Sequence, residues 1–140
     1  MFLGAEAQAV VSGSQSVENS WFENNSSVIN GGAIATRRTI ADNSGAKLDI
    51  IKTMFKLNKA GTTGGAIDNY FYNSNSKAGA VYVADSIFDT NSAKNGGAIY
   101  NHGEKDVAGN SASMYIANTQ FINNAASSND FIALFLHLIL

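Results

Sequence analysis

The stretch SIFDTNSAKNGGAIYN, residues 86–101, contains two short motifs, Phe-x-x-Asn and Gly-Gly-Ala-Ile, and both recur along the 140-residue chain. Phe-x-x-Asn recurs every 33 residues, with its members at Phe22, Asn25, Phe55, Asn58, Phe88, Asn91, Phe121 and Asn124. Gly-Gly-Ala-Ile follows the first three copies by about nine residues, and its glycine pairs are Gly31 and Gly32, Gly64 and Gly65, and Gly96 and Gly97. A fixed period over most of a chain indicates one structural unit stacked on copies of itself.

Aligning the chain on this period sorts residues into columns, a column being the positions that share one place in successive units. Two apolar columns stand two residues apart with a mixed column between them: Leu48, Val81 and Met114; Asp49, Tyr82 and Tyr115; Ile50, Val83 and Ile116. This alternation predicts a strand with one buried face. The phenylalanine column and the isoleucines of Gly-Gly-Ala-Ile provide two further apolar segments, separated by the turn residues Gly, Asn and Ser.

We predict an all-β fold, a parallel β-helix of about four coils of about 33 residues with three short strands per coil. The phenylalanines are expected to fill the interior, the asparagines to form a ladder at one corner, and the paired glycines to occupy a sharp bend. Ankyrin repeats share the period but need helices and a proline-containing turn, and this chain has no proline. A leucine-rich repeat stays the minor alternative, because its period is 20 to 29 residues.

Charged residues also follow the period. Glu23, Lys56 and Asp89 share one column, and Lys52 and Asp85 share another, so neighbouring coils would place opposite charges side by side on the solvent face. Each such pair contributes about 0.2–1 kcal/mol to stability. The alternation of sign is therefore mainly evidence for the register of stacking.

The composition argues against several classes of function. A formal net charge of −2 with 14% charged residues gives no electrostatic footprint for nucleic acid, so we expect no nucleic-acid partner. The chain has no cysteine and hence no disulfide or thiolate ligand. The first nine residues, MFLGAEAQA, do not form a signal peptide. The apolar run 131–140 is half the roughly 20 residues of a spanning helix, so we expect no membrane insertion.

No arrangement of residues predicts catalysis, a cofactor or a metal site. His102 and His137 have no second histidine or cysteine at ligand spacing. Arg37, Arg38 and Asp42 follow the first Gly-Gly-Ala-Ile, where a salt bridge in a loop is favoured over a grip on an anionic sugar. We therefore expect no catalytic, cofactor-binding or metal-binding residues.

The candidate contact residues are Tyr70, Phe71 and Tyr72. They belong to the segment NYFYN, residues 69–73, which we expect to be a loop after the second Gly-Gly-Ala-Ile. Three aromatic residues beside asparagine suit stacking on sugars or a contact patch. Packing of alternate rings on the sheet is the competing interpretation, and it is the one we favour.

The alternation of Phe-x-x-Asn with Gly-Gly-Ala-Ile, from about residue 20 to residue 124, resembles the repeats of the polymorphic outer-membrane protein family and of similar autotransporter and adhesin-like surface proteins. The resemblance implies a right-handed β-helix passenger, exported and displayed at the outer membrane or cell surface for adhesion. Its implied partner is a surface protein or glycan of a host or neighbouring cell. The fourth unit departs from the pattern, because residues 129–132, NDFI, stand where Gly-Gly-Ala-Ile is expected.

We therefore predict a single β-helix domain over residues 1–128, as a fragment of a longer solenoid. The apolar tail 129–140 is interpreted as either a truncation artefact or a degenerate capping coil. The leading function is a non-enzymatic scaffold for adhesion. The alternatives are a carbohydrate-active β-helix, either a polysaccharide lyase or a glycoside hydrolase, and a remnant without independent function. Open strand edges at the ends of the stack also predict self-association.

Overall fold

The computed structural model describes residues 14–39, 47–72, 80–103 and 113–128, and all regular structure within these ranges is β-strand. The strands form four parallel sheets. Their members are β1 (Ser14–Glu18), β5 (Lys47–Ile51), β9 (Ala80–Ala84) and β13 (Ser113–Ala117); β2 (Trp21–Glu23), β6 (Met54–Lys56), β10 (Ile87–Asp89) and β14 (Gln120–Ile122); β3 (Ser26–Ser27), β7 (Lys59–Ala60), β11 (Ser92–Ala93) and β15 (Ala125–Ala126); and β4 (Ile34–Thr39), β8 (Ile67–Tyr72) and β12 (Ile99–Gly103). The tail 129–140 lies outside the described residues.

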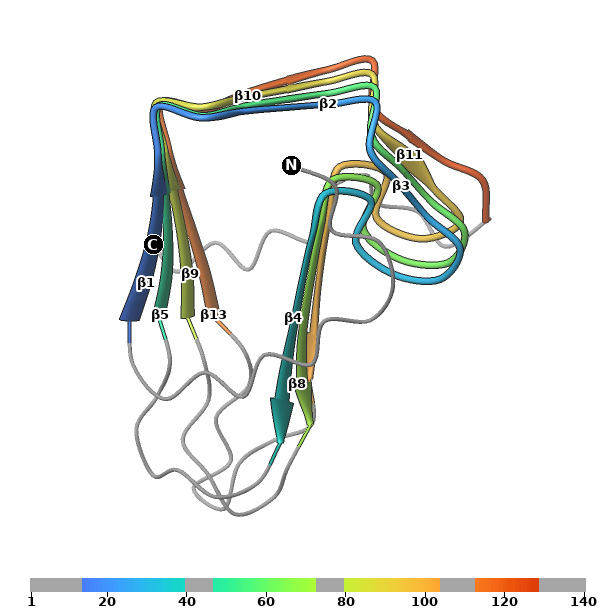
Figure 1. Cartoon of the computed structure of the whole chain (residues 1–140), viewed down its shortest axis with the longest axis horizontal. Helices are drawn as coiled ribbons and strands as arrows, with labels where there is room; N and C mark the ends of the chain where they lie inside the picture. The colour runs from blue at the N-terminus through green and yellow to red at the C-terminus, as the bar shows by residue number, and fades with distance from the viewer. Residues whose placement is uncertain (1–13, 40–46, 73–79, 104–112, 129–140) are drawn as a thin grey trace.

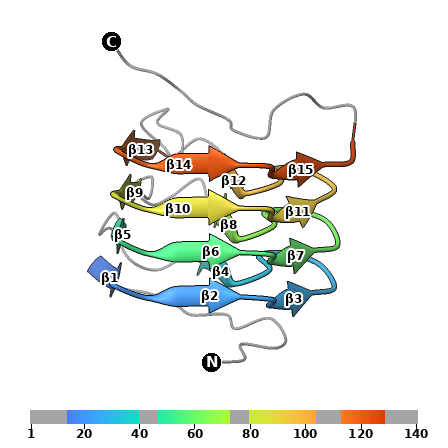
Figure 2. The same ribbon diagram turned by 90° about the horizontal axis from the view of Figure 1, so that it is seen from above.

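Each strand pairs in parallel with the strand four places later, so each turn of the chain lies on the previous one. Leu48 lies beside Val81, and Val81 lies beside Met114, as the 33-residue columns predict. Figure 1 looks along the stack, and Figure 2 shows the coils from the side as parallel layers. The predicted parallel β-helix of about four coils is confirmed.

Each coil also contains a strand that the sequence pattern does not reveal. The two-residue strands β3, β7, β11 and β15 follow the asparagine corner, where the sequence predicts only a turn. Alternation of apolar and polar residues cannot show in two residues, which is why this sheet escaped prediction. Figure 1 shows it beyond the sheet of β4, β8 and β12, so the chain loops outward before it returns to those strands.

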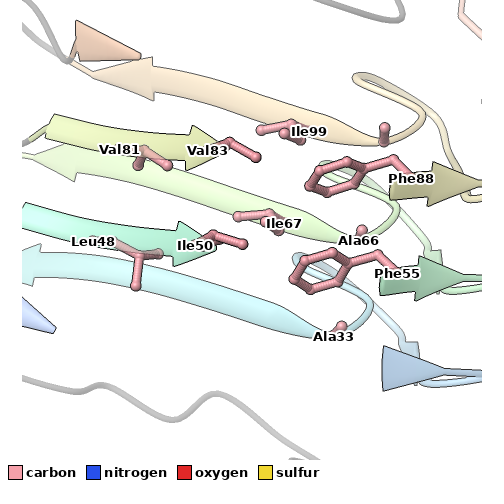
Figure 3. Packing of buried hydrophobic residues seen from close by; sticks show 11 residues of the cluster. Ala33, Leu48, Ile50, Phe55, Ala66, Ile67, Val81, Val83, Phe88 and Ile99 are labelled. Atoms are coloured by element: carbon pink, nitrogen blue, oxygen red, sulfur yellow. The ribbon is translucent and has the colours of Figure 1, made fainter. Parts of the chain in front are cut away.

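The interior is filled by the apolar columns. Ile50, Phe55, Ile67, Val81 and Phe88 are fully buried, and burying side chains of this size stabilises a fold by about 1.5–3 kcal/mol each. Figure 3 shows residues from β5, β6, β8, β9, β10 and β12 meeting in one cluster. The four stacked phenylalanine rings lie 4.7 to 5.0 Å apart between centroids and within 10° of parallel.

The asparagine column forms a continuous ladder at the corner after β2, β6, β10 and β14. The Oδ1 atom of Asn91 accepts hydrogen bonds from the backbone N–H of Asn58 at 3.0 Å and from its Nδ2 at 2.9 Å. The Nδ2 of Asn91 donates to the Phe55 carbonyl at 3.0 Å and to Asn124 Oδ1 at 2.9 Å. Because Asn91 is fully buried, these bonds satisfy the side chain and the backbone of the turn together.

The corner before the phenylalanine strands has a second ladder, of hydroxyl groups, which the sequence analysis missed. Thr53 Oγ1 donates to the Ile51 carbonyl at 2.9 Å, and the Thr53 N–H donates to Ser86 Oγ at 3.1 Å. Ser86 in turn donates to the Ala84 carbonyl at 2.7 Å. The signal was a column of hydroxyl residues two places before each phenylalanine: Ser20, Thr53, Ser86 and Thr119.

Each glycine of a Gly-Gly pair has a separate reason. The first has a positive φ, 64° at Gly64, a backbone conformation that residues other than glycine rarely adopt. The second lies against the neighbouring coil, because a Cβ added to Gly65 would lie 1.9 Å from the Gly97 carbonyl oxygen and 2.6 Å from the Ser92 nitrogen. The motif therefore combines a sharp bend with a close approach between coils.

We expect the Asn58→Ala and Asn91→Ala variants each to lose about 1–3 kcal/mol of unfolding free energy, because each leaves a backbone N–H and a phenylalanine carbonyl without their partners, buried for Asn91 and partly buried for Asn58. Urea denaturation of the 140-residue chain measures this loss. Asn25→Ala is the matched control, since Asn25 is partly buried and its side chain makes one of these bonds, from Nδ2 to Asn58 Oδ1. Equal losses of unfolding free energy in all three variants would contradict the idea that the buried asparagines stabilise the stack more than the partly buried one.

Candidate functional site

Most buried polar side chains in the described ranges belong to the two ladders. The fully or nearly fully buried ones are Thr53, Asn58, Asp68, Ser86 and Asn91. Four of them hold the corners of the coils together. Asp68 is a buried carboxylate on β8, and its neighbours along the stack are Ala35 and Tyr100. Among the described residues, the other four side chains therefore serve the hydrogen bonding between coils.

Carboxylates on the paired strands do not gather on adjacent coils. Asp49 lies between Ser16 and Tyr82, and Asp89 lies between Lys56 and Ile122. Within the described residues, no group of three or more His, Cys, Asp or Glu side chains could hold a metal ion. A lyase or glycosidase needs carboxyl groups facing one bond of a sugar chain, so these columns supply little of what that chemistry requires.

The outward charge column contains one of the ion pairs that the sequence predicts. Lys56 Nζ lies 3.9 Å from Glu23 Oε1, across the pairing of β2 with β6. Both side chains are more than a third exposed, so solvent screening keeps the contribution of the pair small. Its position nevertheless shows that this column faces solvent.

The outward face of the sheet β2–β6–β10–β14 carries a stripe of large apolar residues. Trp21, Met54 and Ile87 occupy neighbouring positions along this face, on the opposite side of the strands from the buried phenylalanines. Trp21 is 64% exposed. Beside the stripe runs the column of Glu23, Lys56 and Asp89. We call these six residues the outer face; an aromatic residue among apolar and charged neighbours is typical of protein contact surfaces.

The sheet β1–β5–β9–β13 presents a second exposed aromatic feature. Tyr82 and Tyr115 are neighbours in register, and their rings stack with centroids 4.6 Å apart and planes 14° from parallel. The two residues are 38% and 47% exposed. The stack orders two large amphipathic side chains at the surface, where they add to the stability of the strand pair and offer ring area to a partner.

The expectation that residues after each Gly-Gly-Ala-Ile form loops is wrong for the described residues. Tyr70, Phe71 and Tyr72 form the second half of β8, and their neighbours along the stack include Arg37, Arg38 and His102. These strands extend because the neighbouring coils provide hydrogen-bond partners for their backbone. The amino-acid composition of a short segment does not reveal partners that lie on another coil. Residue 73, Asp42 and His137 lie outside the described residues.

The sequence motifs do not point to Trp21, the aromatic residue of the outer face, which is 64% exposed. The available signal was its position one residue before an inward phenylalanine, since successive side chains on a strand point to opposite faces. Met54 and Ile87 occupy the same place before Phe55 and Phe88. A column of large apolar residues beside a core column indicates an exposed apolar stripe.

This geometry defines a repeat protein of the parallel β-helix class. Its exposed aromatic, apolar and charged side chains lie on the outer surfaces of the stack. Two segments, residues 22–37 and 85–102, match the family model of the Chlamydia polymorphic membrane protein repeat. Each runs from the phenylalanine strand, or the corner before it, into the strand after Gly-Gly-Ala-Ile. The chain therefore contains two segments that match this repeat, and the family to which the repeat belongs is one of surface proteins. Neither a curated protein nor a solved structure matches the chain.

The tyrosine stack should be measurable as a coupling energy. We expect Tyr82→Ala and Tyr115→Ala to be non-additive by about 0.5–1.5 kcal/mol in a double-mutant cycle, because either substitution removes the same ring contact. Unfolding in urea gives the four free energies. Ser16→Ala paired with Tyr82→Ala serves as the control, since these residues lie on non-adjacent coils. Coupling as large in the control pair would contradict the stack as its source.

Proposed function

We propose that this chain is a non-enzymatic β-helical module of a surface-displayed adhesin or autotransporter passenger. The observation that carries the proposal is the division of side chains between the inside and the outside of the stack. Phenylalanines and asparagines fill the interior and one corner, whereas Trp21 and Tyr115 remain 64% and 47% exposed. The coils hold these outward residues in rigid register, as a contact surface requires.

We further propose a location at the outer membrane or cell surface and a partner on a host or neighbouring cell, either a surface protein or a glycan. The match to a repeat of polymorphic membrane proteins supports this location. The outer face supports a protein partner, because aromatic and apolar residues beside charges form the usual centre and rim of such contacts. In the described part of the chain, no helix is long and apolar enough to cross a membrane.

Adhesion can be tested with beads coated with the 140-residue chain and applied to cultured epithelial cells. We expect retention well above that of albumin-coated beads. Trp21→Ala should reduce the affinity about fivefold or more, because truncating an aromatic anchor at an interface costs more than about 1 kcal/mol. Ser16→Ala, an exposed change on the neighbouring sheet, is the control and should bind as the wild type does. Retention no higher than that of albumin-coated beads would contradict the proposal.

The enzyme alternative makes the opposite prediction. A carbohydrate-active β-helix would cleave uronate polymers or neutral polysaccharides, and we expect no turnover, because the paired strands set no two carboxylates side by side. Reducing-end and unsaturated-uronate assays over polygalacturonate and alginate measure this. Turnover that disappears on substituting Asp49 or Asp89 would replace the scaffold proposal with an enzymatic one.

A further inference from the structure

The asparagine ladder has a direction. At all three steps along the stack, the N–H and the Nδ2 of one asparagine donate to the Oδ1 of the asparagine in the next coil, at 2.9 to 3.1 Å. The Nδ2 of the later asparagine also donates back, to the phenylalanine carbonyl of the earlier coil at 2.8 to 3.0 Å. Because every step has the same sense, the two ends of the ladder differ chemically.

The first coil presents the Oδ1 acceptor and one Nδ2 hydrogen of Asn25, whereas the fourth coil presents two donor hydrogens of Asn124 and the Phe121 carbonyl. Among the residues that the structure describes, no donor bonds to the Oδ1 of Asn25. At the other end, one Nδ2 hydrogen of Asn124 donates to the Phe88 carbonyl. Asn124 also has its N–H and a second Nδ2 hydrogen. In the other asparagines of the ladder, these two groups donate to the Oδ1 of the next coil. The matching acceptor on the fourth coil is the Phe121 carbonyl, the equivalent of those of Phe22, Phe55 and Phe88.

Among the described residues, the apolar side chains at both ends of the stack are only partly buried. The hydrophobic residues that pack on the core and remain partly exposed all lie in the first or the last described strand of their sheets: Val17, Phe22, Ile34, Met114, Ile116 and Phe121. Phe22 stacks on Phe55 and Phe121 stacks on Phe88. One face of each terminal ring therefore has no described ring against it.

The outward columns allow the fourth coil to lie on the first without a clash of charge. If the columns continue from one copy to the next, Ile122 lies beside Glu23, and Ala117 lies beside Glu18. The outward residues of β13 and β14 are uncharged, so neither glutamate meets a like charge. Phe121 would face Phe22 as the other phenylalanines face one another.

We propose that copies of this chain associate head to tail, with β13–β15 of one copy stacked in parallel register on β1–β3 of the next. The donors of Asn124 meet the Oδ1 of Asn25, and the Phe121 carbonyl receives the Nδ2 of Asn25. Two first coils cannot pair in this way, because the Asn25 N–H and one of its Nδ2 hydrogens, the donor pair that meets an Oδ1 at each step of the ladder, already donate to Asn58. A contact between unlike surfaces forms a ring only if its rotation closes, and coils stacked in parallel register continue along one axis, so the assembly is a linear filament. This inference rests on the ladder and not on the proposed adhesion.

Cysteine cross-linking tests the contact with little risk to the fold, since the chain has no cysteine of its own and the chosen positions face outward. Neighbouring strands lie about 4.8 Å apart, within the Cα separation of about 4.4–6.8 Å that a disulfide spans. Mixing the full-length Glu23→Cys and Ile122→Cys variants under mild oxidation should give at least tenfold more heterodimer than mixing Glu23→Cys with Asp89→Cys. Asp89 is the matched control, because it belongs to the same column in the middle of the stack.

Each outcome decides the proposal. Equal heterodimer yields in the two mixtures, or a predominance of Glu23→Cys homodimers, would overturn the head-to-tail contact. Sedimentation velocity of the wild-type chain supplies an independent measurement, in which we expect the mean mass to rise continuously with concentration. A monomer at every concentration overturns the proposal, and a limit at the dimer does so too, because two-fold pairing would then be favoured over an open stack.

Discussion

Each coil of this protein is held to the next by hydrogen bonds that run along the stack, and the asparagine ladder is the part on which the rest depends. A turn between two strands leaves backbone groups that must be satisfied or exposed to water. Asn58 and Asn91 satisfy them from a fully buried position, through bonds to the coils before and after. Because the polar groups of this corner have their partners, the buried phenylalanine rings can pack directly beside it.

Stacking also limits where function can lie. Residues of one inward column lie one strand spacing apart, so each must pack or bond well against a neighbour of its own kind. The phenylalanines, with ring centroids 4.7 to 5.0 Å apart, and the hydrogen-bonded asparagines do so. Inward positions are thus committed to the fold. Outward positions are free to differ from coil to coil, as Trp21, Met54 and Ile87 do. The coils of this chain thus differ on the outside while they repeat one geometry within.

The same bonds give the stack a polarity that its outline does not show. Coils look alike in Figure 2, yet the single sense of the ladder places an Oδ1 acceptor at one end and an N–H and Nδ2 donor pair at the other. Such an end resembles the exposed edge of a sheet, which other proteins protect because it can pair with another chain. The amide side chain of asparagine makes the edge selective, since it carries a donor and an acceptor at fixed places.

The sequence by itself determined the period, the inward columns, the ladder corner and the glycine bend, because stacked coils force equivalent positions to carry equivalent chemistry. Only the tertiary structure decided how far each strand extends and what covers it. The two-residue strands β3, β7, β11 and β15 and the strand character of residues 69–72 come from bonds to coils some 33 residues away, which local composition cannot reveal. The exposure of Trp21 and the stacking of Tyr82 on Tyr115 likewise depend on neighbours in space, since the same residue types serve in a core or on a surface.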